Sequence, residues 1–157
     1  MIRFGEFLPD QSAFNNTGTT VATNVIPSLT GYESFQGLSA ISGTADSTIV
    51  GLFAARDDDG NTALYAADRA KIYKFDTADG SLDNISKSGN YTTATEDKVR
   101  FVQYGETVVA TNFADPIQKI TAAASGLFSD LSADAPKAKY IAVVRDFVMT
   151  GFTNTTS

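Results

Sequence analysis

The sequence predicts an all-β fold, and three observations lead to this expectation. Phe and Tyr, with 11 and 6 residues, far outnumber the 2 Met, while Val, Ile and Thr are plentiful, which favours pleated sheets over helices. Short segments of alternating polarity are separated by turn sequences, as in β-hairpins. These segments also recur along the chain. With 157 residues and 43% hydrophobic side chains, the chain can build a core.

The first part of the chain, residues 1–46, lacks a sustained period of 2 or 3.6 and is rich in Gly, Ser, Thr and Asn. We interpret it as an extended N-terminal arm that precedes a β-rich region at residues 47–157. Its large apolar side chains have no local strand pattern to bury them, so we expect them to dock on a neighbouring subunit. The candidate interface residues are Phe4, Phe7, Tyr32 and Phe35. The alternative is an irregular edge of the same domain.

The β-rich region begins with a strand, turn, strand pattern. Segments 48–55 and 62–67 flank Asp57-Asp58-Asp59-Gly60-Asn61, which has the composition of a tight turn. A third strand is expected at 71–75, because Ile72 and Lys74 alternate with Lys71, Tyr73 and Phe75. The next segment contains Asp79-Gly80, a hairpin signal.

The same pattern occurs twice more. A second group of strands is predicted at 99–104, 107–112 and 117–121, with a turn at Gly105-Glu106. A third group is predicted at 140–144 and 147–152, with a turn at Arg145-Asp146. Each group therefore begins with two strands joined by a tight turn.

Short sequences also recur between the groups. Leu82-Asp83-Asn84-Ile85-Ser86 returns as Phe128-Ser129-Asp130-Leu131-Ser132 at an offset of 46, and Thr111-Asn112-Phe113 returns as Thr150-Gly151-Phe152 at an offset of 39. Such spacing, with about four strands per unit, is typical of propeller blades. The sequence thus predicts a partial β-propeller of four-stranded antiparallel blades, with roughly two and a half blades present. A propeller needs roughly 4 to 8 blades, so we expect either the N-terminal piece of a longer protein or a small sandwich.

Conventional catalytic groups are missing from the sequence. Without His or Cys, the chain has no Ser-His-Asp or Cys-His arrangement and no imidazole or thiolate metal site. Asp57, Asp59 and Asn61 alternate as at the start of a calcium loop, but Gly60 and Asp68 break the EF-hand order, which favours a solvated turn. We therefore predict that the protein is not an enzyme and has no catalytic residues, metal site or cofactor.

The net charge and the hydropathy of the chain restrict the kinds of partner that we expect it to bind. The net charge is −6 and the basic residues are scattered, so tight binding to DNA is not expected, although an acidic wall would let DNA pass. Arg100 and Arg145 are expected to pair with acids on neighbouring strands. Glu6 and Pro9 interrupt any signal-peptide core, and no apolar run approaches about 20 residues. We expect synthesis in a cytoplasm and no membrane insertion.

Several short motifs resemble one family along the whole chain. The opening motifs are Phe4-Gly5-Glu6-Phe7-x-Pro9-Asp10, Asn24-Val25-Ile26-Pro27 and Gly31-Tyr32-x-x-Phe35-x-Gly37-Leu38. Later motifs are Phe53-Ala54-Ala55-Arg56-Asp57, Lys71-Ile72-Tyr73-Lys74, Phe101-x-Gln103-Tyr104-Gly105, Ala110-Thr111-Asn112, Asp115-Pro116-Ile117-Gln118 and Ala142-Val143-Val144-Arg145-Asp146-Phe147-Val148. In this order they resemble the tail hub or nozzle proteins of short-tailed phages and prophages, which are related to packaged-DNA-stabilisation proteins.

The resemblance implies a structural virion protein of the phage tail that is made in the host bacterial cytoplasm. It implies a β-propeller subunit in a sixfold ring of identical copies, placed below the portal and the tail adaptor. Such a ring closes the channel and lets double-stranded DNA pass at infection without binding it specifically. The alternative function is a carbohydrate-binding or polysaccharide-degrading β-module, because glycan-binding proteins use similar folds.

Overall fold

The structure is a computed structural model that describes residues 5–12, 14–28, 31–35, 37–87 and 89–154. In these residues every regular element is a β-strand and no helix occurs, which confirms the predicted all-β class. Accordingly, within these same ranges no helix is long and apolar enough to cross a membrane.

The chain divides into two compact units, Met1–Ala40 and Ile41–Ser157. In the first unit, β1 (Val25–Ser28) and β2 (Gly31–Ser34) form an antiparallel hairpin. A parallel bridge between Phe7 and Thr19 closes a separate loop. This hairpin lies within the predicted N-terminal arm, residues 1–46, whose docking stays a prediction.

The second unit contains two four-stranded antiparallel sheets and a hairpin. The first sheet consists of β3 (Gly51–Arg56), β4 (Thr62–Ala67), β5 (Ile72–Phe75) and β6 (Leu82–Asn84) in chain order. The second sheet consists of β7 (Arg100–Tyr104), β8 (Thr107–Thr111), β9 (Gln118–Thr121) and β10 (Ser129–Asp130), again in chain order. The terminal hairpin consists of β11 (Lys137–Val144) and β12 (Phe147–Asn154).

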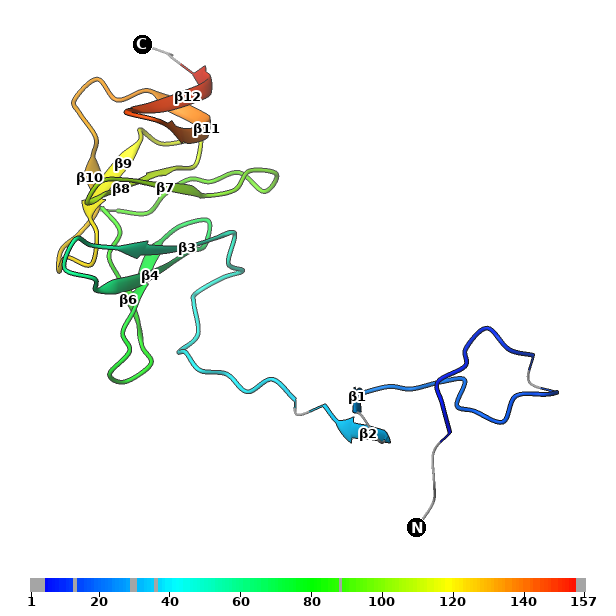
Figure 1. The fold of residues 1–157 in the computed structure, drawn as a ribbon. Helices are drawn as coiled ribbons and strands as arrows, with labels where there is room; N and C mark the ends of the chain where they lie inside the picture. Colours follow the sequence, from blue (N-terminus) through cyan, green and yellow to red (C-terminus); the bar gives the residue numbers. More distant parts are fainter. Residues whose placement is uncertain (1–4, 13, 29–30, 36, 88, 155–157) are drawn as a thin grey trace. The chain divides into compact units, whose positions relative to one another are not determined.

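The three groups are stacked as layers, with the second sheet between the first sheet and the terminal hairpin (Figure 1). The first strands of successive layers are neighbours, because β3 contacts β7 and β7 contacts β11. The predicted repetition of antiparallel strand groups is confirmed by the identical strand order of the two sheets. Neither sheet closes on itself, so a propeller remains a prediction.

Local turn chemistry explains the hairpins. Gly60, Gly80 and Gly105 all have a positive φ, of 89°, 75° and 54°, at the predicted turns, where a side chain would be strained. The Asp57 carboxylate accepts hydrogen bonds from the backbone and side-chain nitrogens of Asn61, at 2.7 and 2.8 Å. The expected solvated turn between β3 and β4 is thus confirmed.

Two hydrophobic clusters hold the layers together. The larger cluster lies between the two sheets and includes Tyr65 and Phe128, whose rings meet edge to face. The smaller cluster lies between the second sheet and the terminal hairpin and is centred on Val109, Ile117 and Ala138. The second sheet is therefore covered on both faces.

A polar side chain caps the turn after the second strand of each sheet. The Asp68 carboxylate accepts the backbone N–H groups of Ala70 and Lys71 at 2.7 and 2.6 Å. In the second sheet, Asn112 Oδ1 accepts the backbone N–H of Asp115 at 2.9 Å. Both caps are buried. Since such turns need a short side-chain acceptor, the two sheets use the same local device at corresponding positions.

Candidate functional site

The candidate interface residues of the arm lie in different local structures. Phe4 is outside the residues that the structure describes. Phe7 lies in the loop closed by Thr19 and is 47% exposed, and Phe35 directly follows β2 and is also 47% exposed. Tyr32 lies in β2, opposite Pro27, and is half-buried.

Backbone hydrogen bonds support these aromatic residues. The N–H of Leu8 donates to the carbonyl of Thr19 at 2.9 Å, and the N–H of Thr19 donates to the carbonyl of Glu6 at 2.8 Å, on either side of Phe7. The N–H of Phe35 donates to the carbonyl of Asn24 at 2.8 Å, which extends the β1–β2 pairing. These hydrogen bonds leave the side chains of Phe7 and Phe35 half exposed. Docking of the two side chains on a partner remains a prediction.

Two carboxylates of the second unit accept hydrogen bonds within turns. Among the described residues, no group of three or more Asp and Glu side chains is arranged to hold a metal ion. The hydrogen bond from the Asn61 side chain lowers the pKa of the Asp57 carboxyl group. At the next turn, the backbone N–H of Ser81 lowers the pKa of the Asp79 carboxyl group. Both aspartates therefore stabilise turns.

An ion pair links the two sheets beside the larger cluster. Lys87 Nζ lies 2.6 Å from a carboxylate oxygen of Asp130, and the side chain of Gln118 also donates to that carboxylate. The bond from Lys87 lowers the pKa of the Asp130 carboxyl group. Nearby, burial raises the pKa of the Tyr91 hydroxyl to about 12, so this phenol stays neutral at physiological pH.

Aromatic and basic side chains meet where the terminal hairpin joins the second sheet. The Arg100 guanidinium lies over the Tyr140 ring at 5.1 Å, so its neighbour is an aromatic ring instead of the expected acid. Lys139 pairs with Asp97 at 2.7 Å and lies within 6 Å of the rings of Phe113 and Phe152, at 5.7 and 5.9 Å. The bond from Asp97 raises the pKa of the Lys139 amine.

One end of the stack has an apolar surface that the segment before β3 covers only in part, and we call it the first-sheet face. Because Phe53 and Ala55 point into the core, strand alternation directs Leu52 to the opposite side of β3. Leu52 is 75% exposed, and Leu64 beside it on β4 is 44% exposed. The first-sheet face consists of Ile41, Leu52, Leu64, Phe75 and Leu82, which line one shallow cleft.

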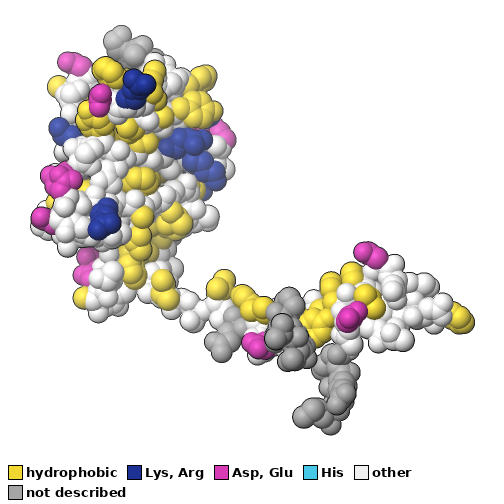
Figure 2. All heavy atoms as spheres, viewed as in Figure 1, with side chains coloured by type: hydrophobic (Ala, Val, Ile, Leu, Met, Phe, Trp, Pro, Cys, Tyr) yellow, Lys and Arg dark blue, Asp and Glu magenta, His cyan; other side chains and the backbone are white. Residues whose placement is uncertain are grey.

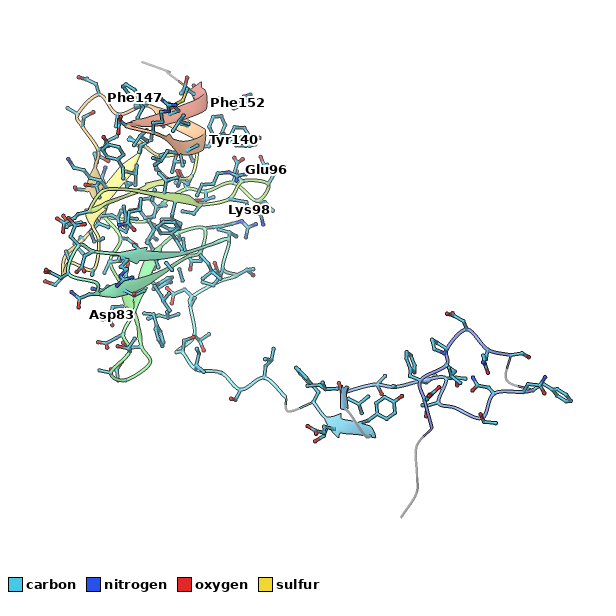
Figure 3. All side chains as sticks on the ribbon, in the orientation of Figure 1. Asp83, Glu96, Lys98, Tyr140, Phe147 and Phe152 are labelled. Atoms are coloured by element: carbon cyan, nitrogen blue, oxygen red, sulfur yellow. The ribbon has the colours of Figure 1, made fainter. Side chains whose placement is uncertain are left out.

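The other end has a second uncovered surface, the hairpin face. Ile141 packs toward the second sheet, so its neighbours on β11 point away from that sheet. The register pairs Ala142 with Met149 and Val144 with Phe147 on the outer side. The hairpin face consists of Ala142, Val144, Phe147 and Met149, all of which are exposed. Figure 2 shows hydrophobic side chains at the surface of this end, and Figure 3 places Phe147 there, far from Asp83.

Neither face was predicted, although the sequence of the terminal hairpin contains a signal for one of them. Strands with one solvated face alternate between apolar and polar residues. Residues 140–144, Tyr-Ile-Ala-Val-Val, are apolar without interruption, as are residues 108–110 in the middle sheet. An uninterrupted apolar strand indicates that both of its faces are covered.

No protein-family model matches this chain, and no curated protein sequence matches it. Function is therefore inferred from the fold and from the exposed surfaces.

Proposed function

We propose that the protein is a non-enzymatic structural subunit of a phage tail, in the hub or nozzle ring below the portal and adaptor. The observation that best supports this proposal is the succession of two identical four-stranded meanders followed by a hairpin. In a propeller, each blade is such a meander, and successive blades pack face to face. The terminal hairpin corresponds to the first half of a third blade.

The contacts between first strands also support propeller-like packing. The side-chain amide of Gln103 on β7 accepts the N–H of Arg56 at 3.0 Å and donates to the carbonyl of the same residue. This reciprocal pair joins β3 to β7 at the edge where the first strands meet. Successive blades of a propeller bring their innermost strands together around the central channel in the same way.

The charges on the first strands favour contact with a passing polyanion. The basic residues Arg56, Arg100, Lys137 and Lys139 lie on β3, β7 and β11, which carry no acidic residue. Two of the four are engaged within the chain, because Lys139 pairs with Asp97 and the Arg100 guanidinium lies over the Tyr140 ring, so Arg56 and Lys137 are the candidates for contact with phosphates. Basic side chains attract phosphate groups and do not distinguish one base sequence from another. Passage of double-stranded DNA requires contacts that do not depend on base sequence.

The alternative, a carbohydrate-binding module, has one favourable observation. A polar cleft at the end of the first sheet is lined by residues that include Asn61, Lys74, Asp76 and Asp83, with Phe75 beside them. Amide and carboxylate groups next to an aromatic ring are able to bind a sugar. Lys74, however, is already engaged, because its amine donates to the carbonyls of Ala123 and Ala124 at 2.9 and 3.1 Å.

Mass photometry and negative-stain electron microscopy of the purified chain at micromolar concentration test the proposal. We expect ring-shaped assemblies, and weak DNA binding that disappears as salt rises from 50 to 200 mM. A chain that remains monomeric at every concentration would contradict the ring. Glycan-array binding without ring formation would favour the carbohydrate-binding alternative, and glycan turnover that is lost with Asp83→Asn would reveal an enzyme.

A further inference from the structure

We propose that a small cavity between the two four-stranded sheets binds one water molecule, which accepts a hydrogen bond from the Tyr91 hydroxyl and donates one to Oε1 of Gln118. This water would join the segment between β6 and β7 to the second sheet. Its support comes from the size of the cavity, from the two polar atoms and from the hydrogen bonds around them. The site lies inside the second unit, so it does not depend on the proposed ring.

The cavity has the size of a single water molecule. It leaves about 10 Å³ for the centre of a water-sized sphere. Apolar residues of both sheets form part of its wall, since Ile72 lies on β5 and Ala110 on β8. Tyr91 and Gln118 contribute polar side chains to the same wall. A buried water needs roughly this much space and at least two polar partners, and both conditions are met here.

Gln118 supplies the acceptor. It is 3% exposed, and its side chain points to the same side of β9 as Ile120, which packs in the cluster between the two sheets. Nε2 of Gln118 donates to the carbonyl of Pro116 at 2.8 Å and also to the Asp130 carboxylate. These two bonds fix which end of the amide carries the oxygen.

Oε1 of Gln118 is left at the other end of that amide. This atom is buried, and no residue in the described ranges donates a hydrogen bond to it. A buried acceptor without a donor destabilises a fold, and in most proteins such an atom is paired with the protein or with an ordered water. A water that donates to Oε1 would therefore stabilise this arrangement.

Tyr91 supplies the donor. The residue is 9% exposed, and its hydroxyl oxygen accepts the backbone N–H of Lys87 at 3.2 Å. Because burial raises the pKa of this phenol to about 12, the hydroxyl keeps its proton at physiological pH. Among the residues that the structure describes, none accepts that proton in a hydrogen bond. The hydroxyl is therefore free to donate into the cavity.

The water would close a ring of hydrogen bonds that runs through an ion pair. The N–H of Lys87 donates to the Tyr91 hydroxyl, and the amine of the same lysine lies 2.6 Å from the Asp130 carboxylate. Gln118 donates to that carboxylate from the other side. The remaining gap in the ring, between Tyr91 and Gln118, has a donor on one side and an acceptor on the other. A water molecule matches both, because it accepts and donates at the same time.

The ring would fix the position of the segment between β6 and β7, residues 85–99. The backbone of this segment is held to the first sheet, since the N–H of Tyr91 donates to the carbonyl of Ala70 at 2.8 Å and the N–H of Thr93 donates to the carbonyl of Arg69 at 3.2 Å. Through the water, the same segment would also be tied to β9 in the second sheet. The water would thus help to hold the two sheets together.

A high-resolution crystal structure of the full 157-residue chain is the first test. We expect a water oxygen within about 3.2 Å of both the Tyr91 hydroxyl and Oε1 of Gln118. A cavity without electron density would overturn the proposal. A water that contacts only one of the two atoms, or a direct hydrogen bond between the two side chains, would overturn it as well.

A double-mutant cycle tests the water in solution. Tyr91→Phe and Gln118→Met each remove one polar partner with little change in the size of the side chain. We expect each change to raise the equilibrium constant of unfolding about 10-fold, as for one buried hydrogen bond. The double variant should raise it by clearly less than the product of the two effects, because loss of either partner already weakens the binding of the water.

Tyr140→Phe is the matched control for the cycle, since it removes the same hydroxyl from a ring that is 49% exposed. Combined with Gln118→Met, it should show no coupling. Urea unfolding gives the equilibrium constants, and circular dichroism checks that each variant folds. Fully independent effects of Tyr91→Phe and Gln118→Met would contradict the bridge. The crystal structure needs no variant, so it decides the question even where a variant does not fold.

Hydrogen exchange gives a third measurement. In Gln118→Met, the Tyr91 hydroxyl would lose its link to β9, so the Lys87 N–H that donates to it should exchange at least about 5-fold faster than in the unaltered chain. The N–H of Ile85 in the same segment donates to the carbonyl of Ile72 at 2.9 Å and should keep its rate. An unchanged rate at Lys87 would show that Gln118 and Tyr91 are not connected.

Discussion

The ring of Phe113 lies against the ring of Phe152, with centroids 5.3 Å apart and planes inclined at 49°. The two residues occupy matching places in the repeated sequence, and both have a left-handed backbone, with φ of 69° and 55°. Such values are uncommon for phenylalanine, so tertiary contacts must hold both residues. The pair connects the second sheet to the terminal hairpin, with Lys139 beside both rings.

We predict that Phe113→Ala and Phe152→Ala are coupled in their effect on the free energy of unfolding. A contact between two rings contributes about 0.5 to 1.5 kcal/mol beyond burial, and a double-mutant cycle isolates this value. Urea unfolding of the two single variants and the double variant gives the measurement. A cycle of Phe113→Ala with Leu127→Ala, at a loop position, is the control and should show no coupling. No coupling between the two phenylalanines would show that their contact adds nothing to stability.

We predict that Val109→Ala destabilises the protein by about 2 kcal/mol, because it removes buried methyl groups and leaves a cavity between two layers. Val144→Ala is the matched control, since Val144 is 47% exposed on the hairpin face whereas Val109 is 2% exposed. Its effect should stay within about 0.5 kcal/mol in the monomer. Denaturant unfolding monitored by circular dichroism compares the two. Equal effects would mean that the terminal hairpin is not packed on the second sheet.

We predict that Asp68→Ala destabilises the first sheet by about 3 kcal/mol, because charged acceptors form strong hydrogen bonds and their loss leaves buried donors unpaired. Asp68 is 1% exposed and accepts the Tyr73 hydroxyl at 3.0 Å in addition to two backbone N–H groups. Asp58→Ala, in the exposed turn, removes the same group and should have little effect. Thermal unfolding of both variants is the measurement, and similar melting temperatures would contradict the capping role.

We predict that Lys87 contributes to the free energy of unfolding by an amount that depends on pH. Lys87 lowers the pKa of Asp130 in the folded protein below its ordinary value of 3.8, so the folded state binds the proton less readily than the unfolded state. The resulting stabilisation is present above the unfolded-state pKa and is lost as the pH falls through the folded-state pKa.

The difference in urea midpoint between the unaltered chain and Lys87→Met should therefore shrink as the pH is lowered from about 5 to 2. Lys98→Met is the control, because it makes the same change in net charge at an exposed lysine. A difference that stays constant over this range would show that Asp130 does not respond to Lys87.

We predict that deleting residues 1–38 leaves the second unit folded but weakens assembly or docking to the tail adaptor. The second unit, Ile41–Ser157, contains both hydrophobic clusters, so the deletion removes none of its core. Circular dichroism and mass photometry measure folding and assembly, and Tyr32→Ala with Phe35→Ala tests the aromatic side chains alone. If the truncated chain unfolds while this double variant assembles normally, the arm is part of the domain and not a docking segment.

Much of the strand and turn pattern could be predicted from the sequence. The turns at Asp57–Asn61, Asp79-Gly80 and Gly105-Glu106 depend on side-chain acceptors and on glycine backbone freedom, which are local properties. The β1–β2 hairpin was not predicted, because its backbone pairing has no accompanying alternation of polar and apolar residues. The hairpin forms through backbone hydrogen bonds, which no local sequence pattern predicts.

The sequence by itself determined the all-β class, the turns and the repetition of strand groups, because backbone preferences and alternation act over a few residues. Only the tertiary structure decided the partner of Arg100, which is the Tyr140 ring, because side chains 40 positions apart meet only once the layers stack. It also decided that Val108 is buried while Leu64, its counterpart in the first sheet, is exposed. Burial depends on whether another layer lies against the face, and that is a property of the packed layers, not of either strand.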